Sequence, residues 1–99
     1  MVAADSAEHG LEAATALLKA LASPVRLAIV RELASGGRPV HELVAALGVS
    51  QPLVSQHLRV LRSTRIVTAR RQAREIEYTL ADDHVAHIVL DAIRHARDG

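Results

Sequence analysis

The sequence contains no cysteine, no phenylalanine and no tryptophan, and Tyr78 is its single aromatic residue. Without cysteine the chain can form no disulfide and offers no thiolate as nucleophile or metal ligand, so any metal site must use histidines and carboxylates. The shortage of aromatic rings disfavours modules that bind RNA or single strands by stacking bases on such rings. The hydrophobic residues, 49% of the chain, must therefore build a core of Leu, Val, Ile and Ala, which favours packed helices.

Long apolar runs are also missing. No run approaches the roughly 20 residues that a membrane-spanning helix needs, and the acidic start of the chain, with Asp5 and Glu8, is unlike a secretory signal. We therefore expect a cytoplasmic protein that makes no membrane contact. At 99 residues the chain fits one domain with a modest core, which a dimer interface would enlarge. The predicted organisation is a flexible tail over residues 1–8 and one domain over residues 9–99.

Helix signals divide the first two thirds of the chain. Ser23 is a cap followed by Pro24 in the first helical position, Gly48 suits a helix end, and Ser50 is a second cap. With leucines at helical spacing before Ser23, these signals predict helices over residues 11–21, 24–34, 40–47 and 51–63.

Two strands and a last helix follow. Residues 76–80 alternate strictly between apolar and polar side chains, which is typical of a half-buried strand, and Asp82 or Asp83 is a helix cap. The predicted elements are strands over residues 66–69 and 76–80, a basic turn over residues 70–74 and a helix over residues 84–97. The predicted fold is mainly α with a small β-hairpin, a winged helix-turn-helix of order ααααββα.

The basic charge of the chain is concentrated, although the net charge is only +1. Between Ser50 and Arg74 there are six arginines and no acidic residue. The third and fourth helices have helix-turn-helix spacing, in which the second helix enters the major groove of DNA. Gln and Arg side chains match adenine and guanine edges, and arginines on a wing neutralise phosphate. The predicted contacts to double-stranded DNA are Gln51, Ser55, Gln56, Arg59 and Arg62 on the helix and Arg70, Arg71 and Arg74 on the wing. Any one of these residues could equally be an ordinary solvated side chain, but the acid-free run favours DNA binding for the set.

The last helix carries potential metal ligands on one stripe, namely His84, His87, Asp91, His95 and Asp98. His84 and His95 are eleven residues apart, about 16 Å along a helix, whereas zinc ligands sit only about 2 Å from the metal. One ion can bind both only if a second copy of the helix runs antiparallel alongside, as in a two-fold dimer. Asp82 and His84 of one subunit would then face His95 and Asp98 of the other. The same residues also fit structural roles, as a helix cap, as a dipole partner and as an i,i+4 pair.

Four segments together carry a family resemblance. They are LLKALASPVRLAIVREL, VHELVAALGVSQPLVSQHLRVLR, REIEYTL and the pattern Asp82-x-His84-x10-His95-x2-Asp98. The chain resembles, from residue 17 to residue 97, the ArsR/SmtB family of metal-responsive winged-helix repressors. The resemblance implies a homodimer built on the first and last helices, zinc at intersubunit sites on the last helix, and an apo dimer that releases its operator when metal binds.

The chain departs from the family pattern at three places. Asp98 stands where His or Glu is usual, so His87, Asp91 or water could replace it as the fourth ligand. The family's cysteine motif falls at residues 40–43, which hold no cysteine, and this argues against arsenic, cadmium or lead sensing. Ala73 stands in the wing where glycine is common.

The sequence also allows alternatives to a zinc-responsive repressor. Nickel or cobalt tolerate more ligands and could recruit His9 or His87. A regulator of the same fold that senses no metal would use its last helix only to dimerise. An enzyme, such as a hydrolase with a His/Asp metal centre, is disfavoured because the chain has no separate pocket-forming domain.

Overall fold

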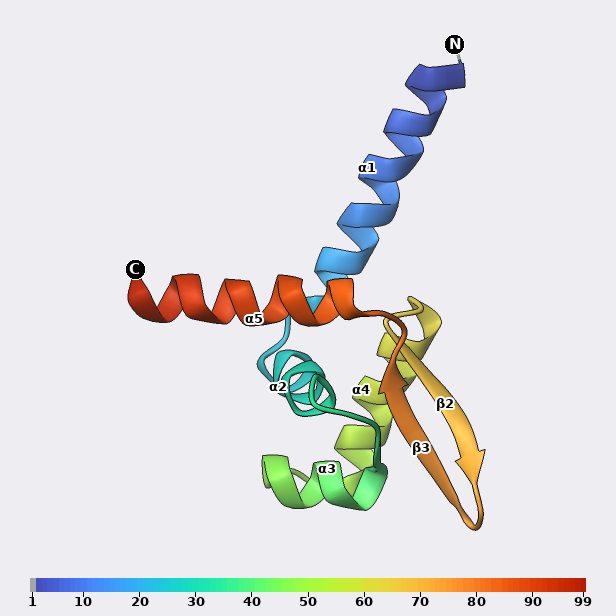
Figure 1. Ribbon diagram of the computed structural model, residues 1–99, viewed down its shortest axis with the longest axis vertical. Coiled ribbons are helices and arrows are strands. Elements are labelled where there is room, and N and C mark those ends of the chain that lie inside the picture. Colours follow the sequence, from blue (N-terminus) through green and yellow to red (C-terminus); the bar gives the residue numbers. More distant parts are fainter. Residues whose placement is uncertain (1) are drawn as a thin grey trace.

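The computed structural model describes the backbone of residues 2–99 and the side chains of residues 8–99. This part of the chain folds in the order α1 (Val2–Leu21), α2 (Pro24–Leu33), β1 (Arg38–Pro39), α3 (Val40–Leu47), α4 (Gln51–Ser63), β2 (Val67–Gln72), β3 (Glu75–Leu80) and α5 (Asp83–Asp98). Helices α2, α3 and α4 lie together beside the β2–β3 hairpin, while α1 and α5 extend outward from this group (Figure 1). The predicted winged helix-turn-helix is confirmed.

Helix ends follow the local signals in the sequence. Ser23, Ser50 and Asp82 cap α2, α4 and α5, and the side chain of each accepts hydrogen bonds from backbone N–H groups of the first turn. Gly48 ends α3 with a φ of 69°, a left-handed conformation that glycine adopts without steric cost. Because only Val49 separates Gly48 from the cap of α4, the turn between α3 and α4 is tight.

The core is aliphatic, as the composition requires. Its largest fully buried side chains are Ile29, Leu43, Leu58, Leu61, Ile66, Val30, Val54, Val67 and Val89, from α2, α3, α4, the hairpin and α5. The side of α4 that carries Val54, Leu58 and Leu61 packs into this core, so its polar side is directed outward. The same core holds the start of β2 through Ile66 and Val67, which ties the wing to α4.

The sheet is larger than the hairpin that the sequence predicted. Its strand order is β1-β3-β2, with Arg38 opposite Tyr78 and Pro39 opposite Glu77. A two-residue edge strand that contains proline has no alternation to reveal it, and it exists only through its pairing with β3. Strand β2 also continues to Gln72, so residues 70 and 71 lie in a strand and not in the turn.

The turn of the wing is therefore short. Gln72 is paired with Glu75, which leaves only Ala73 and Arg74 between the strands. Ala73 has a φ of 55°, in the left-handed region that glycine adopts more easily. Ala73 therefore adopts this turn at a steric cost that glycine would not have.

Helix α1 differs from the prediction at its start. It begins at Val2, so residues 2–8 are helical where the sequence analysis expected a tail. Three alanines in this segment, a residue type with high helix propensity, favour helix. Within residues 8–99, no single helix is both long and apolar enough to span a membrane. The segments Glu8–Leu21 and Pro24–Leu33 meet the criteria of length and apolarity only when taken together, and a bend of 97° separates them.

Candidate nucleic-acid interface and last-helix ligands

Helix α4 presents the predicted polar stripe to solvent. Gln51, Ser55, Gln56, Arg59 and Arg62 are all exposed, in contrast to the three aliphatic residues that bury the opposite side. The helical periodicity of the sequence thus correctly predicted which side of α4 is exposed and which side is buried. This outward side carries amide, hydroxyl and guanidinium groups, which are the groups that contact base edges and phosphates.

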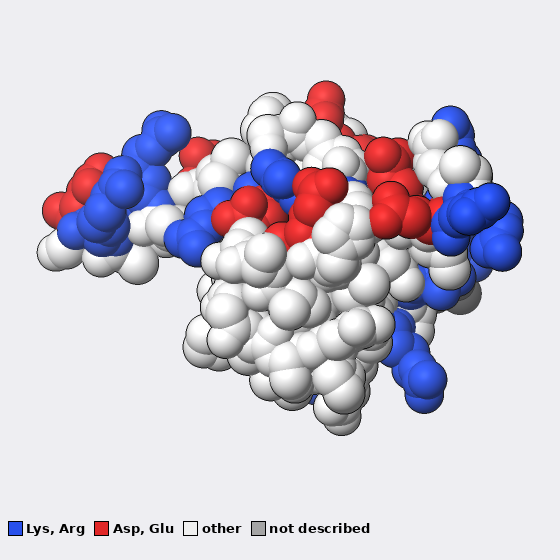
Figure 2. Space-filling model, turned by 90° about the horizontal axis from the view of Figure 1, so that it is seen from below, with Lys and Arg blue, Asp and Glu red and all other residues white. Residues whose placement is uncertain are grey.

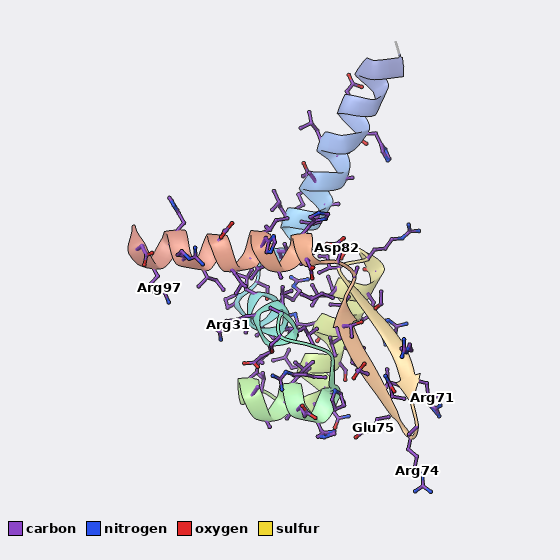
Figure 3. The ribbon with its side chains drawn as sticks, viewed as in Figure 1. Arg31, Arg71, Arg74, Glu75, Asp82 and Arg97 are labelled. Atoms are coloured by element: carbon purple, nitrogen blue, oxygen red, sulfur yellow. The ribbon has the colours of Figure 1, made fainter. Side chains whose placement is uncertain are left out.

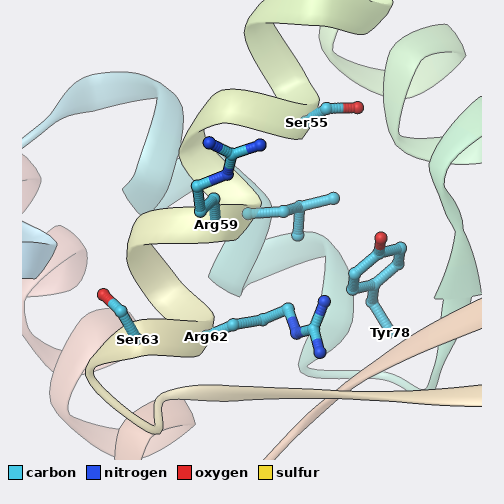
Figure 4. Close-up of a pocket in the computed structure, with 6 residues that line it drawn as sticks. Ser55, Arg59, Arg62, Ser63 and Tyr78 are labelled. Atoms are coloured by element: carbon cyan, nitrogen blue, oxygen red, sulfur yellow. The ribbon is translucent and has the colours of Figure 1, made fainter.

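Two neighbouring depressions lie between α4 and the wing. One, of about 460 Å³, is lined by Ser55, Leu58, Arg59, Arg62, Ser63 and Tyr78 (Figure 4). The other, of about 340 Å³, is lined by residues of α4, of the wing and of the segment from Pro39 to His41. Ser55 and Tyr78 line both depressions, which therefore form one surface, the α4–wing groove.

The wing arginines do not all face this groove. Arg71 and Arg74 line it together with Gln51 and Ser55 of α4. Both lie at the far end of the hairpin, where Arg74 projects beyond the turn (Figure 3). Arg70 is opposite Glu77 in the sheet, whereas Arg71 is opposite Ile76. Because neighbouring residues of a strand point to opposite faces, Arg70 lies on the other face of the wing.

Charge is unevenly distributed over the side of the molecule that carries α3 and the wing tip. Figure 2 shows Lys and Arg side chains gathered at the wing and towards the C-terminal end of α5, with acidic side chains between them. The exposed basic groups of α4 and of the wing line the groove between them. This distribution favours contact with a phosphate backbone that runs from α4 to the wing.

A contact between His41 and Glu75 connects the wing to the helix-turn-helix. Nδ1 of His41, in the first turn of α3, lies 3.3 Å from a carboxylate oxygen of Glu75 at the start of β3. Figure 3 shows Glu75 on the side of the wing that faces α3. Both side chains are more than half exposed, so the pair contributes little to stability. It does bring a carboxylate into the α4–wing groove beside Arg71 and Arg74.

His57 lies on α4 away from the polar stripe. Burial, and secondarily the Arg26 guanidinium of α2, lower the pKa of His57 below the ordinary value of 6.5. Nε of Arg26 is itself buried and has no hydrogen-bond partner among residues 8–99. A charged His57 would place a second cation beside this group, so the fold favours neutral histidine.

The shifted pKa of His57 predicts an acid sensitivity. Well above pH 6.5 the side chain is neutral in both the folded and the unfolded protein. As the pH falls below 6.5, the unfolded chain binds the proton first, so the free energy of unfolding decreases until the folded pKa is also passed. Thermal unfolding should show a smaller acid loss for His57→Gln than for the wild type. Identical pH dependence in the two proteins would show that His57 is not the cause.

The potential metal ligands lie at the two ends of α5, and all are exposed. Asp82 and His84 are at its start, where Oδ1 of Asp82 accepts hydrogen bonds from the backbone N–H groups of His84 and Val85 at 2.9 and 3.3 Å. His95 and Asp98 are at its end, where Oδ1 of Asp98 lies 3.5 Å from Nε of Arg97. Within residues 8–99 of one chain, no three histidine or acidic side chains come together in a way that could hold a metal ion.

The additional candidates are exposed as well. His87 and Asp91 lie between the two ends of α5, and His9 is on α1. Both helices also expose large apolar side chains, which are Leu11 and Leu18 on α1 and Ile88 and Leu90 on α5. Exposed apolar residues on two helices that extend from the body are typical of an interface that another chain covers.

Two features of the interface escaped the sequence analysis. Tyr78 was assigned only to the buried pattern of a strand, yet it lines the groove beside Arg62. The His41–Glu75 pair joins residues far apart in sequence. The register of the hairpin is the signal that could have found Tyr78, because the apolar alternation of β3 directs its ring towards α4.

The tight helix-turn-helix, the polar outward side of α4 and the basic wing together are the features of the winged-helix class of DNA-binding domains. A family model described as bacterial regulatory protein, arsR family, matches residues 23–69. The chain belongs to this ArsR/SmtB family, as the sequence analysis predicted. Members of the family are transcriptional regulators and not enzymes.

Individual relatives agree with this assignment. The HTH-type transcriptional repressor SmtB of Mycobacterium tuberculosis is 60% identical over 86 residues, which are 87% of this chain and 64% of SmtB. The chain thus spans a little under two thirds of that relative. The transcriptional repressor BigR of Xylella fastidiosa is 38% identical with a TM-score of 0.76, covering 92% of each chain. The homodimeric winged helix-turn-helix DNA-binding domain Mb0332 of Mycobacterium bovis is 31% identical with a TM-score of 0.84, covering 95% of this chain and 87% of its own.

Proposed function

We propose that the protein is a homodimeric transcriptional repressor that binds double-stranded operator DNA in its metal-free form. The observation that carries this proposal is the α4–wing groove, in which Gln51 and Ser55 of the recognition helix line the same surface as Arg71 and Arg74. One duplex can thus be read by α4 and held by the wing at the same time. Base contacts are assigned to Gln51, Ser55, Gln56 and Arg59, and phosphate contacts to Arg62, Arg71 and Arg74. Arg70, which the sequence also predicted as a phosphate contact, lies on the other face of the wing and is not part of this groove. In a bacterium such a protein acts in the cytoplasm, where the DNA is.

The dimer is proposed to form through α1 and α5. Leu11 and Leu18 of α1 and Ile88 and Leu90 of α5 would be covered by the second chain, which enlarges a small core. A two-fold dimer presents two copies of α4 to half-sites about one DNA turn, roughly 34–36 Å, apart. The Mycobacterium bovis relative is described as homodimeric, which supports a dimer but not a particular interface.

Zinc is the proposed effector. Its ligands would be Asp82 and His84 of one subunit and His95 and Asp98 of the partner subunit, a set of two nitrogens and two oxygens that suits tetrahedral zinc. The side chains fit this role because all four are exposed, and both cap bonds of Asp82 use Oδ1 and leave Oδ2 for another partner. When bound, zinc supplies bonds that join α5 of one chain to α5 of the other.

Control of DNA binding then follows from linkage. The orientation of the two α5 helices sets the distance between the two copies of α4. If zinc binds more tightly to the dimer geometry that fits the operator poorly, it lowers DNA affinity, and DNA lowers zinc affinity by the same factor. Such couplings are typically about 1–3 kcal/mol, or roughly 5- to 150-fold in affinity.

The test is a titration of DNA with and without zinc. A fluorescent duplex selected from a random library with the metal-free protein is titrated by anisotropy, first with a chelator and then with one equivalent of zinc per subunit. We expect tight binding without metal and a loss of affinity with zinc in the range given above. Failure of the metal-free protein to bind any duplex would contradict the DNA-binding role, and equal binding with zinc would contradict the sensing role.

Nickel or cobalt is the alternative effector, with His9 or His87 as extra ligands. Absorption of the cobalt form separates the two possibilities, because four ligands give a tetrahedral spectrum and six an octahedral one. A regulator that senses no metal is the second candidate. It is favoured by the structural roles of two of the ligands, since Asp82 caps α5 and Asp98 pairs with Arg97.

A further inference from the structure

Tyr78 occupies the junction between α4 and the wing. It lies on the central strand β3, opposite Arg38 on one side and Ala69 on the other, and its ring packs against the core. Side-chain hydrogen bonds of the wing join Thr68 to Thr79 and Gln72 to Glu77, while among residues 8–99 the Tyr78 hydroxyl takes part in none. The aromatic ring is therefore held in place, and its polar end lacks a partner.

The surroundings of this hydroxyl are rich in donors. In the depression of about 460 Å³, the Arg62 side chain extends towards the Tyr78 ring, and Arg59 and Ser55 lie above it (Figure 4). Ser63 also lines the depression, but its hydroxyl donates to the carbonyl of Val60 at 2.8 Å. The donors free to face a ligand are thus the guanidinium groups of both arginines and the hydroxyls of Ser55 and Tyr78. No carboxylate lines this depression.

A cluster of donors and positive charge without a carboxylate matches the acceptor oxygens of a phosphate group. Its position identifies the source of the phosphate. Tyr78 and Ser55 line the second depression as well, where Arg71 and Arg74 of the wing lie, so a DNA strand that runs from α4 to the wing passes over both side chains. We propose that the hydroxyl of Tyr78, with Arg62 and Ser55, binds one backbone phosphate of duplex DNA at this junction. The inference rests on the proposed DNA-binding function and adds a contact that fixes the wing relative to α4.

The first test removes only the hydroxyl. Tyr78→Phe keeps the ring in the core, so thermal unfolding should be unchanged, whereas affinity for a selected duplex should fall roughly tenfold, as for a lost hydrogen bond to a charged group. The slope of affinity against salt should stay the same in Tyr78→Phe and should decrease by about one in Arg62→Ala, because only the arginine carries charge. Ser63→Ala, which removes a hydroxyl already used within α4, is the matched control and should bind normally.

The second test locates the phosphate. Duplexes carrying a single neutral methylphosphonate at successive backbone positions are titrated with the wild type and with Tyr78→Phe. At one position in each half-site the methylphosphonate should weaken the wild type but have little further effect on Tyr78→Phe. Equal affinity of Tyr78→Phe and the wild type, or a loss that is additive at every position, would overturn the proposal. A wild type that binds no duplex would instead refute the proposed function.

Discussion

Replacing Arg59 by alanine is expected to weaken binding to a selected operator by roughly 5- to 150-fold, the cost of a bidentate contact to a base, about 1–3 kcal/mol. Arg59 is exposed on the outward side of α4, one turn beyond Ser55, and its side chain lies along the helix on the side that carries Ser55 (Figure 4). No acidic side chain in this depression competes for it. Titration of the selected duplex and of an unrelated duplex with both proteins measures the effect, which should be larger for the selected one.

Two other arginines are the controls for this prediction. Arg71→Ala, on the wing, should weaken both duplexes to the same extent and reduce the salt dependence, because it removes a phosphate contact. Arg31→Ala removes the same charge from the exposed side of α2 and should leave binding nearly unchanged. If Arg59→Ala binds the selected duplex as the wild type does, the assignment of the base-reading side of α4 is wrong.

Local signals were sufficient for most of the fold. Ser23, Ser50 and Asp82 each begin a helix because a single side chain satisfies the free N–H groups of the first turn, an interaction that spans only three residues. Strand β1 could not be predicted in this way. Its two residues are strand only because β3 supplies their partners, and that pairing joins positions about forty apart.

For the candidate interface, the sequence predicted which residues of α4 are exposed, but not how the helix and the wing are arranged around the groove. The 3.6-residue period separated the outward side of α4 from its buried side, and this needs no knowledge of the rest of the chain. The groove depends on which residues of the hairpin face α4, and the short turn at Ala73 decided this by extending β2 to Gln72. That register places Arg71 on the face of the wing towards α4 and Arg70 on the opposite face. The sequence alone does not show this difference, because the two arginines are adjacent.

The double substitution His84→Ala and His95→Ala is expected to abolish the response of DNA binding to zinc, while the metal-free affinity stays as in the wild type. The two histidines lie at opposite ends of α5 and are exposed, so neither contributes to the core nor to the α4–wing groove. In the proposed dimer each zinc site takes one histidine from each subunit, so the double variant loses two of the four ligands of both sites. The measurement is the anisotropy titration with chelator and with zinc, repeated on this variant.

His87→Ala is the matched control for this prediction, because it removes an exposed histidine from the same helix without touching any of the four proposed ligands. It should retain the zinc response. Thermal unfolding of both variants should be measured as well. Loss of His95 near the C-terminal end of α5 removes a favourable interaction with the helix dipole and is expected to reduce stability slightly. Persistent release of DNA by zinc from the double variant would show that the metal binds elsewhere, whereas loss of the response in His87→Ala would place the fourth ligand nearer the middle of α5.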